Sequence, residues 1–167
     1  MEKFEIDFAK REDKIKISQL IKLSLKKTEI SSFDYVAGLI KEFGPSQYSL
    51  KMTLNKKIIG FHEFFDENIN TRNIDEYEFK EDVEKYQQKR GLRGYLFVIH
   101  PDYQKKGYGS AFIEYEKLLF KNKFDYIFGS CDIRFNNIEF WEKHRRIICN
   151  HLDSNKKIVA YETIMDL

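Results

Sequence analysis

The sequence predicts an α+β fold in one domain spanning residues 1–167. Aromatic residues, mostly Phe and Tyr, make up 16% of the chain and favour a sheet-bearing core. Some apolar runs alternate with polar residues like half-buried strands, and others recur at helical spacing. With 167 residues, the chain is long enough for one domain that buries roughly 70% of its unfolded surface.

The composition restricts the classes of binding partner and the cellular compartment that we expect for this protein. Lys and Arg number 29 against 27 Asp and Glu, and this net charge of +2 disfavours a nucleic-acid partner. Two cysteines, Cys131 and Cys149, without an apolar leader indicate reduced thiols in the cytoplasm. No apolar run approaches the roughly 18 residues of a membrane span, so no membrane association is expected.

The first half of the chain predicts a strand, two helices and an antiparallel hairpin. Ser31, with Asp34 three residues later, is a candidate helix cap, and Gly44-Pro45 ends that helix. The turn at 55–57 joins the hairpin strands. The predicted ranges are strand 4–8, helix 13–27, helix 31–43, and hairpin strands 48–54 and 58–65.

The segment 66–93 is polar, with acidic residues early and basic residues late, which suits a helix dipole. Phe79, Val83 and Tyr86 would form a narrow apolar edge, so we expect an amphipathic helical insertion bounded by Gly91 and Gly94. Two roles remain open for it: a solvated decoration, or a lid over a substrate site.

The second half predicts a strand, a helix, a strand, a short helix and a terminal hairpin. In the longer helix the apolar positions are Ala111, Phe112, Tyr115, Leu118 and Leu119. The predicted ranges are strand 95–99, a helix from about 107, strand 126–128, helix 136–143, and hairpin strands 147–152 and 157–165. The result is a mixed, mostly antiparallel sheet of about seven strands flanked by about four helices.

An anion site is predicted where strand 95–99 ends, a glycine turn follows, and a helix begins. The N–H groups of the first helical turn lack intrahelical partners, and glycines allow the backbone to approach a ligand closely. Phosphate is the expected anion. The sequence contains no Walker motif or dinucleotide fingerprint. The scattered His and Cys residues match no zinc spacing, so no metal is expected.

The spacing Gln104-x-x-Gly107-x-Gly109, after Ile99-His100-Pro101, resembles the acyl-CoA signature of the GNAT superfamily of N-acetyltransferases. The element order over nearly the whole chain is also similar to that fold. The resemblance implies acetyl-CoA as co-substrate, with its pyrophosphate on the backbone of the loop and its pantetheine arm along Ile99. The implied cofactor-binding residues are Ile99, Gln104, Lys105, Lys106, Gly107, Tyr108, Gly109, Ser110 and Asn136.

The candidate general base lies on the strand that precedes segment 66–93. Direct transfer to an amine needs a base, and the strand before the loop has no carboxylate, so Glu63 is the leading candidate, with His62 and His100 behind it. Adjacent residues on a strand face opposite ways, so His62 and Glu63 are not expected to line one site.

The leaving-group side departs from the family pattern. Trp141 occupies the position at which many family members have a tyrosine that acts as general acid. An indole N–H is not a proton source near neutral pH, so Trp141 would instead line the acyl pocket or pack in the core. Asn136 and Asn137 would contact pantetheine or cap the short helix. Three alternatives remain open: release of the thiolate to water, a proton donor elsewhere such as Tyr103 or Tyr161, or loss of activity.

Three hypotheses follow for the function. The first is an acetyl-CoA-dependent N-acyltransferase acting on a small-molecule or peptide amine. The second is a non-catalytic acyl-CoA binding or sensing module, and the third is an RNA- or protein-interaction domain, which has the least support. Acidic residues in 66–93 would suit a cationic acceptor. The exposed edge of the terminal hairpin would allow a homodimer as well as a monomer.

Overall fold

The computed structural model describes residues 3–25, 31–69, 77–79, 84–86, 88–135 and 137–167. The chain forms two compact units, residues 1–65 with 95–116 and residues 66–94 with 117–167. Within the described residues, eight strands have the order β1-β2-β3-β5-β6-β8-β7-β4, and β5 has residues in both units. Among the described residues, no helix is long and apolar enough to cross a membrane.

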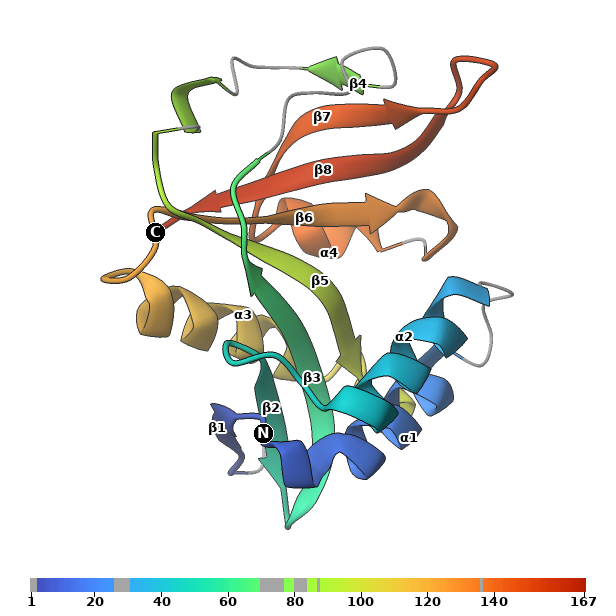
Figure 1. The fold of residues 1–167 in the computed structure, drawn as a ribbon, viewed down its shortest axis with the longest axis vertical. Helices are drawn as coiled ribbons and strands as arrows, with labels where there is room; N and C mark the ends of the chain where they lie inside the picture. The colour runs from blue at the N-terminus through green and yellow to red at the C-terminus, as the bar shows by residue number, and fades with distance from the viewer. Residues whose placement is uncertain (1–2, 26–30, 70–76, 80–83, 87, 136) are drawn as a thin grey trace. The chain divides into compact units, whose positions relative to one another are not determined.

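The first unit has the predicted strand, helix pair and hairpin (Figure 1). Asn55 and Lys56 have φ values of 49° and 65°, as a tight hairpin turn requires. Gly44, with φ 91°, ends the second helix and donates its N–H to the Ile40 carbonyl at 2.9 Å. The elements are β1 (Glu5–Phe8), α1 (Lys14–Leu25), α2 (Ser31–Phe43), β2 (Leu50–Leu54) and β3 (Lys57–Asp66).

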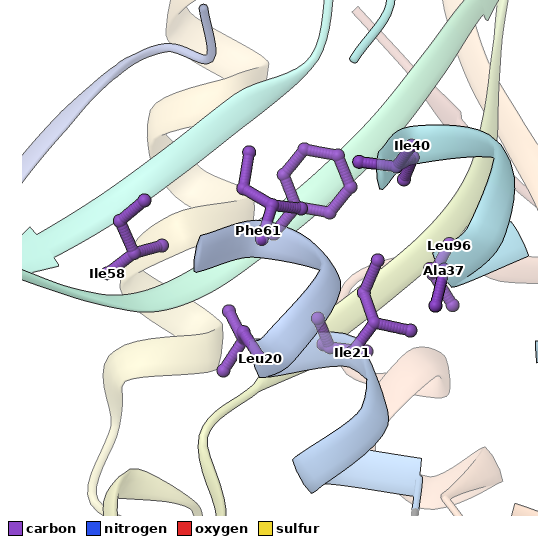
Figure 2. Close-up of a cluster of buried hydrophobic side chains, with 9 residues drawn as sticks. Leu20, Ile21, Ala37, Ile40, Ile58, Phe61 and Leu96 are labelled. Carbon is purple, nitrogen blue, oxygen red and sulfur yellow. The ribbon is translucent and has the colours of Figure 1, made fainter. Parts of the chain in front are cut away.

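An apolar cluster joins the two helices to the sheet of the first unit (Figure 2). It contains side chains of α1, α2, β3 and the end of β5 (Gly91–Ile99). Burial of this apolar surface holds α1 and α2 against one face of β3 and β5. The members are Ile17, Leu20, Ile21, Ala37, Ile40, Ile58, Phe61, Leu96 and Val98.

Helix α3 (Tyr108–Phe120) covers the opposite face of β3. A Cβ atom added at Gly60 would lie 3.1 Å from the Phe112 ring and 2.9 Å from the Ile99 side chain. Because Gly60 and Phe61 are neighbours on a strand, they face opposite ways. Gly60 therefore leaves the room that lets α3 pack closely on the strand.

The buried face of α3 differs from the predicted one. Tyr115 and Leu118 are 38% and 64% exposed, whereas Ile113 and Glu116 are fully buried with Phe112. The prediction omitted Glu116 from the inner face because a carboxylate is rarely buried without a partner. Here the partner exists, since Glu116 Oε1 lies 2.8 Å from His62 Nδ1.

The second unit contains the end of the chain as predicted, with longer strands. Strand β6 passes through Gly129, where an added side chain would collide with the backbone of Gly94. The terminal hairpin forms, with Lys156 at φ 61° in its turn. The elements are β6 (Tyr126–Asp132), α4 (Ile138–Glu142), β7 (Arg146–Leu152) and β8 (Ile158–Asp166).

The predicted helical insertion is wrong over the described residues of 66–93. Residues 77–79 form strand β4 (Tyr77–Phe79), and a 3₁₀ turn covers Glu84–Tyr86. Gly91 and Gly94 do not bound a helix, because both lie in β5. Val83 lies outside the described residues. The change from acidic to basic residues along this segment is compatible with strands and turns as well as with a helix, so it did not determine the structure.

Strand β4 also changes the expectation for the edge of the sheet. It pairs antiparallel with β7 from Tyr77↔His151 to Phe79↔Cys149. Over these residues the outer edge of the terminal hairpin is already paired, so it does not offer the free edge that a dimer was expected to use. In the part of the chain that the structure describes, the seven predicted strands are therefore joined by β4.

Candidate coenzyme A site

The candidate phosphate loop follows directly from the end of β5. A 3₁₀ turn at Pro101–Tyr103 reverses the chain, and His100 caps it by accepting the Asp102 N–H at its Nδ1, at 3.2 Å. The Gln104 side chain then folds back and donates to the Ile99 carbonyl at 2.9 Å. These bonds attach the start of the loop to the end of the strand.

Two residues of the loop have left-handed backbone angles. Lys105 has φ 57° and Gly107 has φ 87°, and α3 begins at the next residue, Tyr108. The first α-helical bond runs from the Ala111 N–H to the Gly107 carbonyl at 3.0 Å. The N–H groups of the first turn, including those of Tyr108 and Gly109, are thus directed at the loop with the positive end of the helix dipole. This arrangement can bind an anion through the backbone.

Ile99, whose backbone is a candidate partner for an extended ligand, is the last residue of β5. The next residue, His100, donates its N–H to the Ile59 carbonyl on β3 at 2.8 Å. Because successive N–H groups of a strand point to opposite sides, the Ile99 N–H points away from β3. The parallel register of β5 with β6 covers Gly91–Arg93 and ends well before Ile99. An extended ligand could therefore pair with this part of β5 as an added strand.

Glu63 is a buried carboxyl group on β3, 4% exposed. Its Oε1 accepts the Ser46 N–H at 2.9 Å, whereas its Oε2 has no partner among the described residues. Burial raises the pKa of Glu63, and the Ser46 N–H together with the nearby hydroxyls of Ser46 and Ser49 opposes that rise. A carboxyl group with a raised pKa is a better proton acceptor near neutral pH than an exposed one.

The two histidines near Glu63 lie in separate networks. His62 faces α3 and pairs with Glu116, while Glu63 faces Ser46, so the two neighbours point apart as predicted. Burial lowers the pKa of His100, and the charge of Lys57 lowers it further. A neutral ring that accepts at Nδ1 carries its proton on Nε2, so His100 is better suited to donate there than to act as a base.

Trp141 lies on α4 in the second unit, where it is 7% exposed. Its ring packs against Phe140, with centroids 5.1 Å apart, and the Arg145 guanidinium lies 4.5 Å from its centroid. Asn137 accepts a hydrogen bond from the Cys131 thiol at 3.0 Å. Asn136 lies outside the described residues. The binding roles assigned to Asn136 and Trp141 stay predictions.

Three polar contacts of the first unit were missed by the sequence analysis. They are the serine pair around Glu63, the His62–Glu116 pair, and the approach of Lys57 to Tyr103, whose ring centroid lies 5.6 Å from Nζ. Each joins residues at least 14 positions apart, and no local motif marks them. Across the described ranges, no group of three or more His, Cys, Asp and Glu side chains could hold a metal ion.

Comparison with known proteins identifies the class of fold. No family model matches the sequence, and no curated protein matches it. Solved structures do match, and they cover nearly the whole chain. The chain has the fold of the GNAT superfamily of N-acetyltransferases.

Three of the matching structures show how far the likeness extends. A GNAT-family acetyltransferase from Listeria monocytogenes aligns with TM-score 0.65 and 14% identity, covering 98% of this chain and 95% of that chain. The ribosomal-protein-S18-alanine N-acetyltransferase from Escherichia coli aligns with TM-score 0.65 and 11% identity, covering 98% and 94%. PaiA N-acetyltransferase from Thermoplasma acidophilum, in complex with coenzyme A, aligns with TM-score 0.60 and 12% identity, covering 99% and 100%.

Proposed function

We propose that this protein is a cytoplasmic acyltransferase that moves an acetyl group from acetyl-CoA to a primary amine. The acceptor is a small-molecule or peptide amine, and the protein acts as a monomer or homodimer. The fold supports transfer of an acyl group at the level of the superfamily. A coenzyme A complex of a protein with this fold supports the choice of a CoA thioester as the donor.

The observation that best supports the proposal is the backbone of the loop between β5 and α3. Left-handed angles at Lys105 and Gly107, directly before a helix of 13 residues, direct several N–H groups at one place. The pyrophosphate of coenzyme A has the charge and the size for such a site. The pantetheine arm would then pair with the Ile99 end of β5.

In the proposed reaction the amine nitrogen attacks the thioester carbonyl carbon, and the carbon–sulfur bond breaks. Glu63 takes the proton of the amine through a water molecule, which suits its burial. The Ile99 N–H, which points away from β3, donates to the carbonyl oxygen as negative charge develops there. Trp141 offers no acidic proton, so the thiolate leaves to water.

A thiol-release assay tests the proposal. Purified protein is given acetyl-CoA with a panel of amines: polyamines, aminoglycosides and lysine-containing peptides. We expect free thiol above the hydrolysis background with at least one acceptor, and mass spectrometry should find that acceptor heavier by one acetyl group. If acetyl-CoA binds but no acceptor is modified, the protein is a non-catalytic acyl-CoA binding module. If acetyl-CoA does not bind, both hypotheses are wrong.

A further inference from the structure

Two lysines from distant parts of the chain lie at one aromatic ring beside the loop. Lys57 Nζ, at the start of β3, is 5.6 Å from the centroid of the Tyr103 ring, and Lys106 Nζ, within the loop, is 5.8 Å from it. Both lysine side chains are exposed, and the Tyr103 ring is half-buried. A cation over an aromatic ring is attracted by the negative face of the ring, by about 0.5–1 kcal/mol at an exposed site.

The charges around this ring are not balanced within the protein. Of the carboxylates that the structure describes, none forms an ion pair with Lys57, Lys105 or Lys106. The positive charge of Lys57 helps to lower the pKa of His100, whose ring centroid lies 5.4 Å from that of Tyr103. Both ammonium groups lie beside one ring, so an anion bound next to that ring would be attracted by both charges.

We propose that Lys57 and Lys106, held at the Tyr103 ring, bind the 3′-phosphate of coenzyme A. This inference rests on the proposed function, because it takes the backbone of the loop as the pyrophosphate site. The 3′-phosphate is a dianion on the ribose next to the pyrophosphate, and Tyr103 immediately precedes the loop in sequence. The assignment adds Lys57, the first residue of β3, to a site that the sequence motif confines to 99–110.

These lysines could contact either of two groups of coenzyme A, the pyrophosphate or the 3′-phosphate. Lysine side chains and backbone N–H groups recognise phosphates in different ways. Backbone N–H groups of a loop fix the position of the pyrophosphate, whereas mobile ammonium groups act as point charges on an exposed dianion. Lysines at the 3′-phosphate should therefore discriminate coenzyme A from dephospho-coenzyme A, which keeps the pyrophosphate and lacks the 3′-phosphate. Lysines at the pyrophosphate should not discriminate.

Calorimetric titration with these two ligands tests the assignment. The variants Lys57→Met and Lys106→Met keep most of the apolar stem and remove the charge, and Lys56→Met, at the adjacent residue, is the matched control. Unmodified protein should bind coenzyme A about 10-fold or more tightly than dephospho-coenzyme A, as one or two charge-assisted contacts provide. Each test variant should lose most of that preference and keep its affinity for dephospho-coenzyme A within about two-fold. The control should behave like the unmodified protein.

A second variant tests the role of the ring. Tyr103→Leu removes the surface that holds both lysines, so it should reduce the same preference, whereas Tyr103→Phe should retain it. Thermal unfolding of each variant checks that the fold persists, as expected for exposed lysines.

Equal losses of affinity for both ligands in the lysine variants would overturn the assignment and place the lysines at the pyrophosphate. Equal affinity of the unmodified protein for the two ligands would also overturn it, while leaving the proposed function intact. Unmodified protein that binds neither ligand would instead refute the proposed function.

Discussion

Glu63 has two carboxylate oxygens in different surroundings. One accepts the Ser46 N–H at 2.9 Å, and the other is buried with no partner among the described residues. Burial penalises the ionised form, so the pKa of Glu63 in the folded protein lies above its ordinary value near 4.5. The serine bonds limit this penalty but do not remove it.

The raised pKa of Glu63 makes a prediction about stability and pH. Between the unfolded and folded pKa values the folded chain holds more protons than the unfolded chain, so this group lowers stability as pH rises through that window. Glu63→Gln removes the titration. Relative to unmodified protein, the Gln variant should therefore gain stability as pH rises from about 4 toward neutrality, starting from near the ordinary Glu pKa. Urea unfolding at several pH values measures this, and a difference that stays constant with pH would contradict it.

Gly107 is the loop position at which backbone conformation matters most. Its φ of 87° is costly for a residue with a side chain, by about 1–2 kcal/mol. Gly107→Ala should therefore distort the loop and weaken coenzyme A binding about 10-fold or more. Gly38→Ala is the control, because an added Cβ there meets nothing within 4 Å, and should stabilise α2 by about 0.5–1 kcal/mol. Calorimetry that finds normal affinity in Gly107→Ala would contradict the role of the loop.

At the scale of the elements, α3 is fixed to β3 by a buried polar pair. Glu116 and His62 are 0% and 2% exposed at their side chains, and their contact is 2.8 Å. Glu116→Ala leaves His62 buried without this partner, so it should lower the free energy of unfolding by about 1–3 kcal/mol. Lys117→Ala, exposed on the same helix, should change it by no more than about 0.5 kcal/mol. Denaturant titration of both variants measures this, and a loss below about 1 kcal/mol for Glu116→Ala would show that the pair is not needed.

The same helix shows what the sequence could and could not predict. The strand, turn and helix from 95 to 120 follow from an apolar run, two glycines and a helical repeat, which are all local signals. The inner face of α3 was predicted incorrectly, because Glu116 is buried only through its pairing with His62. Segment 66–93 gave a helical charge pattern, yet residues 77–79 form a strand because β7 is available to pair with them. Both errors depend on partners distant in sequence.

The candidate site likewise contains residues that a local motif identifies and residues that only the folded chain brings together. The loop residues Gln104–Ser110 are contiguous and were identified from a motif. The contacts of Glu63 with Ser46 and of Lys57 with Tyr103 join separate elements, so they appear only once the chain is folded. The sequence therefore predicts the ligand, whereas the residues that would tune its binding and the catalysis are recognised only in the folded structure.

At the scale of the whole molecule, the two cysteines report whether the second unit is folded, because both lie in it. Cys131 and Cys149 are both free and buried, and burial raises the pKa of the Cys131 thiol to about 11. Because the thiolate is the reactive form, neither should react readily with a disulfide reagent in native protein at pH 8. In denaturant both should react. Rapid native reaction would contradict the described packing, and its absence keeps protein thiols from interfering with the thiol-release assay.

The proposed function depends on the backbone from Gln104 to Gly109 binding the pyrophosphate of coenzyme A. The most direct measurement is a titration of ¹⁵N-labelled protein with coenzyme A, followed through the backbone amide resonances. The largest shifts should fall on the amides of this loop and of Ile99, and Gly107→Ala should need about 10-fold or more coenzyme A to reach them. If coenzyme A binds while these amides stay unchanged, or if it does not bind at all, the claim is wrong.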